Sequence, residues 1–225
     1  MPLQVTDITP ADTVDIVGNA VLVVVDIQGG GQPSSFGADK PGYMPGRPER
    51  NAKAVDMVNR FRAKGVPVVF IQEVHKPSLI DMGRELDGTE NVHCVEGDPR
   101  TELHPGLEPR PEEYLIKKRR YSAFFGSELD IVLKGYKAQT LILIGGMTDV
   151  CIHYTAVDAH QLDYRFRTVS DMVIGSSQKA HDAALRAMKY LQRDALVTLD
   201  AVDAWLDAQP NPDAQPTPAA TEENA

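Results

Sequence analysis

Cys151 is the residue of this chain whose sequence surroundings best suit covalent chemistry. It follows the apolar run 141–144 and a Gly-Gly-Met-Thr-Asp-Val segment, an order typical of a strand, a tight turn and a helix start. Ligands of α/β proteins bind where a strand ends and a helix begins. The helix dipole and free N–H groups there favour the thiolate, the nucleophilic form of cysteine. Cys151 is therefore a candidate nucleophile, and a buried structural thiol is the alternative.

Two ionisable residues follow other predicted strands. Asp26 lies near the end of the apolar run 19–27, and Lys118 follows the short run 114–116. The carboxyl ends of parallel strands meet at one edge of a sheet, so we expect both side chains near Cys151. Asp26 could accept the thiol proton and return it to a leaving group. Lys118 could hold that carboxylate, and backbone N–H groups of the turn before the cysteine could stabilise an oxyanion.

The elements that must position these residues are six strand-like runs separated by helix-like segments. The strand-like runs span residues 19–27, 66–71, 114–116, 140–144, 167–169 and 195–199. The helix-like segments span residues 49–64, 125–134, 149–162, 178–192 and 200–207. Thr148 and Asp200 are the expected N-caps of two of these helices. The alternation predicts an α/β fold of three αβα layers, with a six-stranded, mainly parallel sheet in a Rossmann-like order.

Composition excludes several classes of partner. The chain carries 23 Lys and Arg against 32 Asp and Glu, a net charge of -9, which argues against nucleic acid and anionic membrane surfaces. No apolar stretch approaches the roughly 20 residues of a membrane span, and no signal peptide is recognisable. We expect one domain over residues 1–208, a disordered tail at 209–225, and a cytoplasmic protein with free thiols.

Three segments together resemble the isochorismatase-like cysteine hydrolase superfamily. They are VLVVVDIQ, IKKRRYSAFFGSELD and LILIGGMTDVCIHYTAVDAHQLDYRFRTVSDMV, and the likeness covers roughly residues 19–200. The resemblance implies a catalytic triad of Asp26, Lys118 and Cys151, with Lys118 rather than Lys117 at the spacing that fits Tyr121. It also implies a cis peptide at Gly146–Met147 and an oxyanion hole made by the amides of Met147 and Cys151. The implied reaction is amide hydrolysis through a thioester, with Asp26 first as acid and then as base.

Glu73-x-His75 is similar to the Asp-x-His metal motif of the nicotinamidase branch of that superfamily. Here the carboxylate is a glutamate, and no second histidine follows His75 at close range. His93 lies in VHCVEGDPR, which resembles an ordinary loop of the family. We therefore expect no metal and no cofactor, with a metal site at Glu73 and His75 as the alternative.

The candidate substrate-binding residues lie on the loops after the predicted strands. They are Gln28, Phe36, Glu73, His75, Arg84 and Tyr121. KRRYSAFFGSELD is most similar to the ureido and carbamoyl amide branch, which includes biuret, triuret and ureidoacrylate hydrolases and N-carbamoylsarcosine amidohydrolase. The resemblance therefore implies an amidohydrolase of a small polar ureido or carbamoyl compound, in a homodimer or homotetramer. The alternatives are a nicotinamidase-like or maleamate-like amidase and a non-catalytic member that binds a small ligand.

Overall fold

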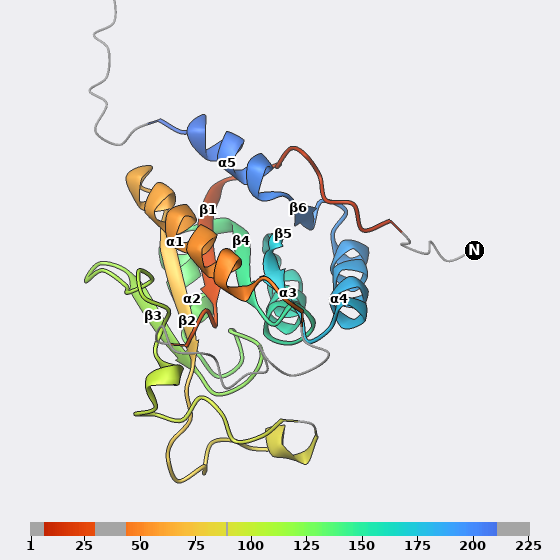
Figure 1. Ribbon diagram of the computed structural model, residues 1–225. Coiled ribbons are helices and arrows are strands. Elements are labelled where there is room, and N and C mark those ends of the chain that lie inside the picture. Colours follow the sequence, from red (N-terminus) through yellow and green to blue (C-terminus); the bar gives the residue numbers. More distant parts are fainter. Residues whose placement is uncertain (1–6, 30–43, 89, 211–225) are drawn as a thin grey trace, which may run out of the picture.

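The computed structural model describes residues 7–29, 44–88 and 90–210 and contains one six-stranded sheet (Figure 1). The strand order is β3-β2-β1-β4-β5-β6, and every neighbouring pair is parallel. The strands are β1 (Asn19–Val25), β2 (Val68–Glu73), β3 (Tyr114–Lys118), β4 (Ala138–Gly146), β5 (Arg165–Ile174) and β6 (Leu196–Val197). The predicted six-stranded α/β fold is confirmed.

Helices cover both faces of the sheet and complete three layers. They are α1 (Arg47–Ala63), α2 (Leu129–Gly135), α3 (His153–Gln161), α4 (Gln178–Leu191) and α5 (Leu199–Asp207). Because side chains alternate along a strand, Val21, Val23 and Val25 of β1 pack with α2, α3 and α4. Leu22 and Val24 pack on the other face with α1 and α5. A strand buried on both faces is uniformly apolar, which explains the near-continuous apolar run of β1.

The strand order creates a crevice between β1 and β4. From β1 the chain moves through β2 to β3 on one side, and then returns to β4 on the other side of β1. Ligands of such sheets bind at the carboxyl edge of this switch point. Asp26 directly follows β1, Lys118 ends β3, and Cys151 lies in the turn after β4. The fold thus brings the three predicted catalytic residues to one edge.

Gly145 allows β4 to approach β1 closely at this edge. Its φ is +127°, and a Cβ there would lie 1.9 Å from the carbonyl oxygen of Val25, its partner in the ladder. Only glycine combines that φ with such a close approach. Asp26, the first residue after β1, has a left-handed φ of 51°, a conformation that aspartate tolerates better than most residues. Glycine at 145 therefore keeps the turn before the cysteine against the end of β1.

Two predicted helix caps are wrong. Thr148 lies inside a π-helical turn, Thr148–Ile152, and its hydroxyl contacts Nδ1 of His181 at 2.9 Å instead of capping the helix. The helix therefore begins one residue earlier than the sequence pattern indicated. At α5 the cap is Thr198, whose Oγ1 accepts from the N–H of Ala201, because the helix already includes Asp200.

Two predictions fall on parts of the chain that the structure does not describe. Phe36 and residues 211–225 of the expected tail lie outside the described residues. In residues 7–29, 44–88 and 90–210, no helix is both long and apolar enough to cross a bilayer.

Candidate active site

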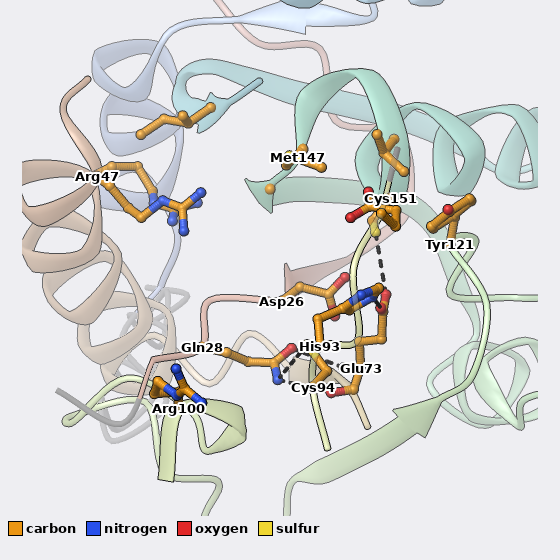
Figure 2. Close-up of a pocket in the computed structure, with 15 residues that line it drawn as sticks. Asp26, Gln28, Arg47, Glu73, His93, Cys94, Arg100, Tyr121, Met147 and Cys151 are labelled. Atoms are coloured by element: carbon orange, nitrogen blue, oxygen red, sulfur yellow. Dashed lines mark hydrogen bonds and ion pairs between the residues drawn. The ribbon is translucent and has the colours of Figure 1, made fainter. Parts of the chain in front are cut away.

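The predicted catalytic residues form one buried cluster, which also contains Glu73. Nζ of Lys118 lies 2.9 Å from Oδ2 of Asp26 and 3.5 Å from Sγ of Cys151, and it also donates to Oε2 of Glu73. Sγ of Cys151 lies 3.7 Å from the same glutamate oxygen. Asp26, Glu73 and Cys151 point toward one another across the pocket (Figure 2). The ammonium group of Lys118 thus contacts two carboxylates and the thiol at the same time.

The register of β2 and β3 explains why Glu73 belongs to this cluster. Glu73 and Lys118 are direct partners in the parallel ladder, at the last residue of each strand. Lys118 and Ile116 are buried, whereas Lys117 between them is exposed, so the alternation of the strand selects Lys118 as the inward lysine. Glu73 was expected to bind substrate. The structure shows in addition that its carboxylate contacts the lysine and the thiol directly.

Lys118 remains a cation although it is fully buried. Burial alone would lower its pKa, but Asp26, Cys151 and Glu73 together raise that pKa well above the usual value. A buried charge is tolerated only when it is paired and hydrogen-bonded. Two carboxylates provide that compensation here.

The two carboxylates have opposite pKa shifts. Burial, reinforced by the charge of Glu73, raises the pKa of Asp26 to about 6 against the opposing effect of Lys118. Burial would also raise the pKa of Glu73, but the charge of Lys118 and the neighbouring rings of His75 and His93 hold it well below its usual value. Two carboxyl groups whose pKa values differ in this way can take different roles in a reaction. Asp26 can exchange a proton near neutral pH, while Glu73 stays ionised.

Cys151 holds its proton in the resting site. Burial raises the pKa of its thiol well above the usual value, and Asp26 and Glu73 add to this, while Lys118 opposes it. The helix start was expected to favour the thiolate, whereas burial beside two carboxylates favours the protonated thiol. The proton must be removed during the reaction, and Asp26 is the neighbouring group with a suitable pKa.

The backbone before Cys151 is unusual in two ways. The peptide bond between Gly146 and Met147 is cis, as the resemblance implies. The following turn is π-helical, and the N–H of Ile152 donates to the carbonyl oxygen of Met147 at 3.1 Å. Single π-helical turns are frequent at functional sites. The role of the Met147 and Cys151 amides as an oxyanion hole stays a prediction.

A cavity of about 80 Å³ opens onto Cys151, enough for a few water molecules or a small ligand. Of the predicted substrate-binding residues, Gln28, Glu73 and Tyr121 line it. His75 and Arg84 do not, and for them the prediction is corrected. His75 is fully buried beneath the loop that carries Val95, whereas the side chain of Arg84 is 93% exposed.

The side-chain amide of Gln28 fastens the loops around the cavity. Its Nε2 donates to the carbonyl oxygens of Glu73 at 2.9 Å and Thr101 at 2.6 Å, and its Oε1 accepts from the N–H of Glu73 at 3.0 Å. Gln28 thereby fixes the backbone of the glutamate that contacts Lys118.

Three arginines that were not predicted from the sequence line the cavity: Arg47, Arg50 and Arg100. The first two lie three residues apart in the first turn of α1, so they share a helix face. Their spacing in GRPERN was the available signal. Arginine at a helix start usually lies in solvent, and nothing in the local pattern indicates burial.

Four buried side chains beside the cluster offer a set of metal ligands: Glu73, His75, Glu85 and His93. Oε1 of Glu73 lies 2.7 Å from Nε2 of His93 and 3.5 Å from Nε2 of His75. Oε2 of Glu85, in a 3₁₀ turn at Glu85–Asp87, lies 3.5 Å from His75 and 3.7 Å from His93. From the sequence, no metal was expected because no second histidine follows His75 closely. In the fold, however, the ring centroids of His75 and His93 lie 5.6 Å apart.

The polar atoms of this cluster fit a divalent cation. Within the described part of the chain, neither ring nitrogen of His75 and neither carboxylate oxygen of Glu85 has a hydrogen-bond partner. Buried polar atoms without partners are costly, and two imidazoles with two carboxylates are a donor set that Zn²⁺ accepts. Without a cation, the hydrogen bond to Glu73 outweighs the effect of burial and raises the pKa of His93 to about 9, so that this ring is protonated.

A parallel α/β sheet with a thiol, an ammonium and a carboxylate at its switch point is suited to a hydrolytic enzyme. The chain belongs to the isochorismatase family, since the isochorismatase domain matches residues 20–201. Family membership and fold together agree with the resemblance expected from the three sequence segments.

Three relatives are 26 to 28% identical to this chain over the aligned residues. The ureidoacrylate amidohydrolase RutB of Pseudomonas savastanoi pv. phaseolicola is 26% identical over 216 residues, which cover 85% of this chain and 81% of the relative. Among solved structures, an isochorismatase family protein from Desulfovibrio vulgaris is similar with a TM-score of 0.70, 28% identity and coverage of 84% and 98%. The N-carbamoylsarcosine amidase of Thermoplasma acidophilum follows with a TM-score of 0.62, 26% identity and coverage of 80% and 95%.

Proposed function

We propose that this protein is a cysteine-dependent amidohydrolase that cleaves a C–N bond of a small ureido or carbamoyl compound and releases ammonia or an amine. The observation that carries the proposal is the contact of Lys118 with both the carboxylate of Asp26 and the thiol of Cys151. Two of the three relatives named above are called an amidohydrolase and an amidase, in line with a hydrolase of C–N bonds other than peptide bonds. Their names also favour a ureido or carbamoyl substrate.

In the first half of the reaction, Asp26 accepts the proton of Cys151, and Sγ attacks the carbonyl carbon. The C–S bond forms as the carbonyl electrons move to oxygen, and the amides of Met147 and Cys151 stabilise that oxyanion. The oxyanion then collapses, the C–N bond breaks, and Asp26 gives its proton to the departing nitrogen. A thioester on Cys151 remains.

In the second half, Asp26 removes a proton from water, which attacks the thioester. The C–S bond breaks, the acid leaves, and the proton returns to the sulfur. The sum is one amide and one water converted to one acid and one amine. Asp26 serves as base, acid and base again, which its pKa of about 6 permits.

Glu73 keeps the charge of the site balanced. Its ionised carboxylate compensates Lys118, so that Asp26 and Cys151 share a single negative charge and a single proton. Moving the proton from sulfur to carboxylate shifts the negative charge between two neighbours of the same ammonium group. This arrangement limits the cost of forming a thiolate in a buried site.

A divalent cation, if bound, would be held by Glu73, His75, Glu85 and His93. When bound it would withdraw negative charge from Oε1 of Glu73. The chain's own residues carry every step above.

Ammonia release tests the proposal. The purified protein is assayed with biuret, triuret, N-carbamoyl amino acids, ureidoacrylate, nicotinamide and maleamate. We expect turnover with at least one ureido or carbamoyl compound. Turnover of nicotinamide or maleamate alone would move the protein to another branch of the family, and no ammonia from any compound would refute a small-amide hydrolase.

We further propose that the protein is a homodimer or homotetramer of the cytoplasm. Exposed Phe125 and Tyr154 beside a surface hollow support association of copies. Light scattering after size-exclusion chromatography should give two or four times the mass of one chain, and a monomeric mass would contradict the assembly.

A further inference from the structure

Arg50 is a buried cation in the wall of the active-site cavity. The residue is 6% exposed, and it lines the same cavity as Cys151. Its Nε donates to Oδ1 of Asn51 at 2.9 Å, and Asn51 in turn contacts His104 at 3.4 Å. These contacts hold the guanidinium in one orientation.

The outer nitrogen Nη1 of Arg50 has no hydrogen-bond partner within the described part of the chain. A Cβ placed on Gly146 would lie 3.6 Å from this nitrogen, so Nη1 lies against the turn that leads to Cys151. Burying a charged donor without a partner is costly, and proteins keep such a group where a ligand completes its hydrogen bonds.

Within the described part of the chain, the positive charge of Arg50 is not neutralised by a neighbouring carboxylate. Burial and the neighbouring Arg47 lower the pKa of Arg50 to about 9, and among residues 7–29, 44–88 and 90–210 no carboxylate forms an ion pair with it. Arg100, on the same side of the cavity, is already engaged by Asp98.

The cavity therefore has two chemically different sides. Arg47 and Arg100 lie on the side away from Cys151 and Tyr121 (Figure 2). Three acids line the cavity: Asp26 and Glu73 are compensated by Lys118, and the charge of Glu90 acts on His93 and Tyr121. A small molecule with a reactive carbonyl at the thiol and a negative charge toward the arginines would match this distribution.

We propose that Arg50 binds a carboxylate of the substrate, which makes the preferred substrate a small anionic amide, such as an N-carbamoyl or ureido acid, and not a neutral ureide. The inference rests on the proposed amidohydrolase function and narrows its substrate class. A guanidinium pairs with a carboxylate through parallel hydrogen bonds, which fixes orientation as well as charge. A site with a buried unpaired donor discriminates strongly against analogues that leave it unpaired.

The test compares each acid with its methyl ester in the ammonia-release assay, using N-carbamoyl amino acids, ureidoacrylate and maleamate. We expect kcat/KM of the native protein to be at least about 100-fold higher for the acid. Arg50→Met should reduce that ratio by about the same factor, and Arg50→Lys should restore part of it. Arg165→Met, in an exposed arginine at the first residue of β5 and away from the cavity, is the control and should keep the ratio.

Two measurements separate this inference from its alternatives. A purely structural role for Arg50 predicts that Arg50→Met lowers Tm and weakens turnover of acid and ester equally, and that result would overturn the inference. Removing an unpaired buried charge should instead leave Tm unchanged or raise it.

Calorimetry on Cys151→Ala protein tests the subsite even if no compound is hydrolysed. Tighter binding of an acid than of its ester, lost with Arg50→Met, would support the subsite while the absence of turnover refutes the proposed function. Equal binding of acid and ester, or no binding of any acid, would refute the subsite itself.

Discussion

Replacing Glu73 with glutamine should move the acid limb of the pH–rate profile to lower pH. Asp26 must be ionised to accept the thiol proton, so kcat/KM should fall as pH drops through the pKa of Asp26, about 6. The charge of Glu73 is one of the causes that raise this pKa. Glu73→Gln removes that charge, and it also frees Lys118 to pair more fully with Asp26. Both effects favour the ionised form of Asp26.

The size of the shift follows from the spacing of the groups. The facing atoms of Asp26, Glu73 and Cys151 lie within 4.8 Å of one another. Two unit charges at that distance interact by about 0.9 kcal/mol in water and by about 3.5 kcal/mol at an effective dielectric constant of about 20. One pKa unit corresponds to about 1.4 kcal/mol, so the acid limb should move down by about 0.6 to 2.5 pH units.

The assay is kcat/KM measured from about pH 4.5 to 8 for the native protein and the variant. Glu96→Gln is the matched control, because Glu96 pairs with Lys76 at the surface, and it should leave the limb in place. An acid limb that stays where it is in Glu73→Gln, or moves to higher pH, would refute the assignment of the two carboxylates.

Three further predictions concern the proton carrier, the glycine turn and the metal ligands. Asp26→Asn should lower kcat by about 10²–10⁴-fold with an unchanged circular dichroism spectrum, and a smaller loss would assign the proton transfer elsewhere. Gly145→Ala should lower the free energy of unfolding in urea by more than about 3 kcal/mol, because its Cβ would collide with Val25. Gly135→Ala, where a Cβ meets nothing within 4 Å, should change it little, and equal losses would contradict the steric argument. Zn²⁺ should bind one equivalent in calorimetry and lose that binding in His75→Gln, whereas a native protein that binds no zinc would reject the metal site.

The proximity of Asp26, Lys118 and Cys151 could be predicted from the sequence because it follows from the topology of the sheet. Parallel strands place their carboxyl ends at one edge, so Asp26, Lys118 and Cys151 could be associated from three apolar runs and the residues that follow them. The burial alternation of β3 agrees with the selection of Lys118 over Lys117.

The positions of Glu73 and Arg50 in the site could not be predicted from the sequence, because they depend on contacts with residues that are distant along the chain. β2 extends two residues past its apolar run, and pairing with β3 carries Glu73 to Lys118. Arg50 has the local pattern of a solvated helix start, and only the packing around α1 buries it. In the same way, His75 and His93 are separated by an aperiodic loop, so their proximity has no local signal.

The proposed mechanism requires Cys151 as the nucleophile, and one measurement tests this role directly. Ammonia release is followed for the native protein and for Cys151→Ala with the best substrate of the screen, after thermal unfolding has shown that both are folded. The alanine variant should lose turnover to the background rate, since Asp26, Lys118 and Glu73 cannot form the thioester. Turnover of Cys151→Ala at a rate close to that of the native protein would contradict it.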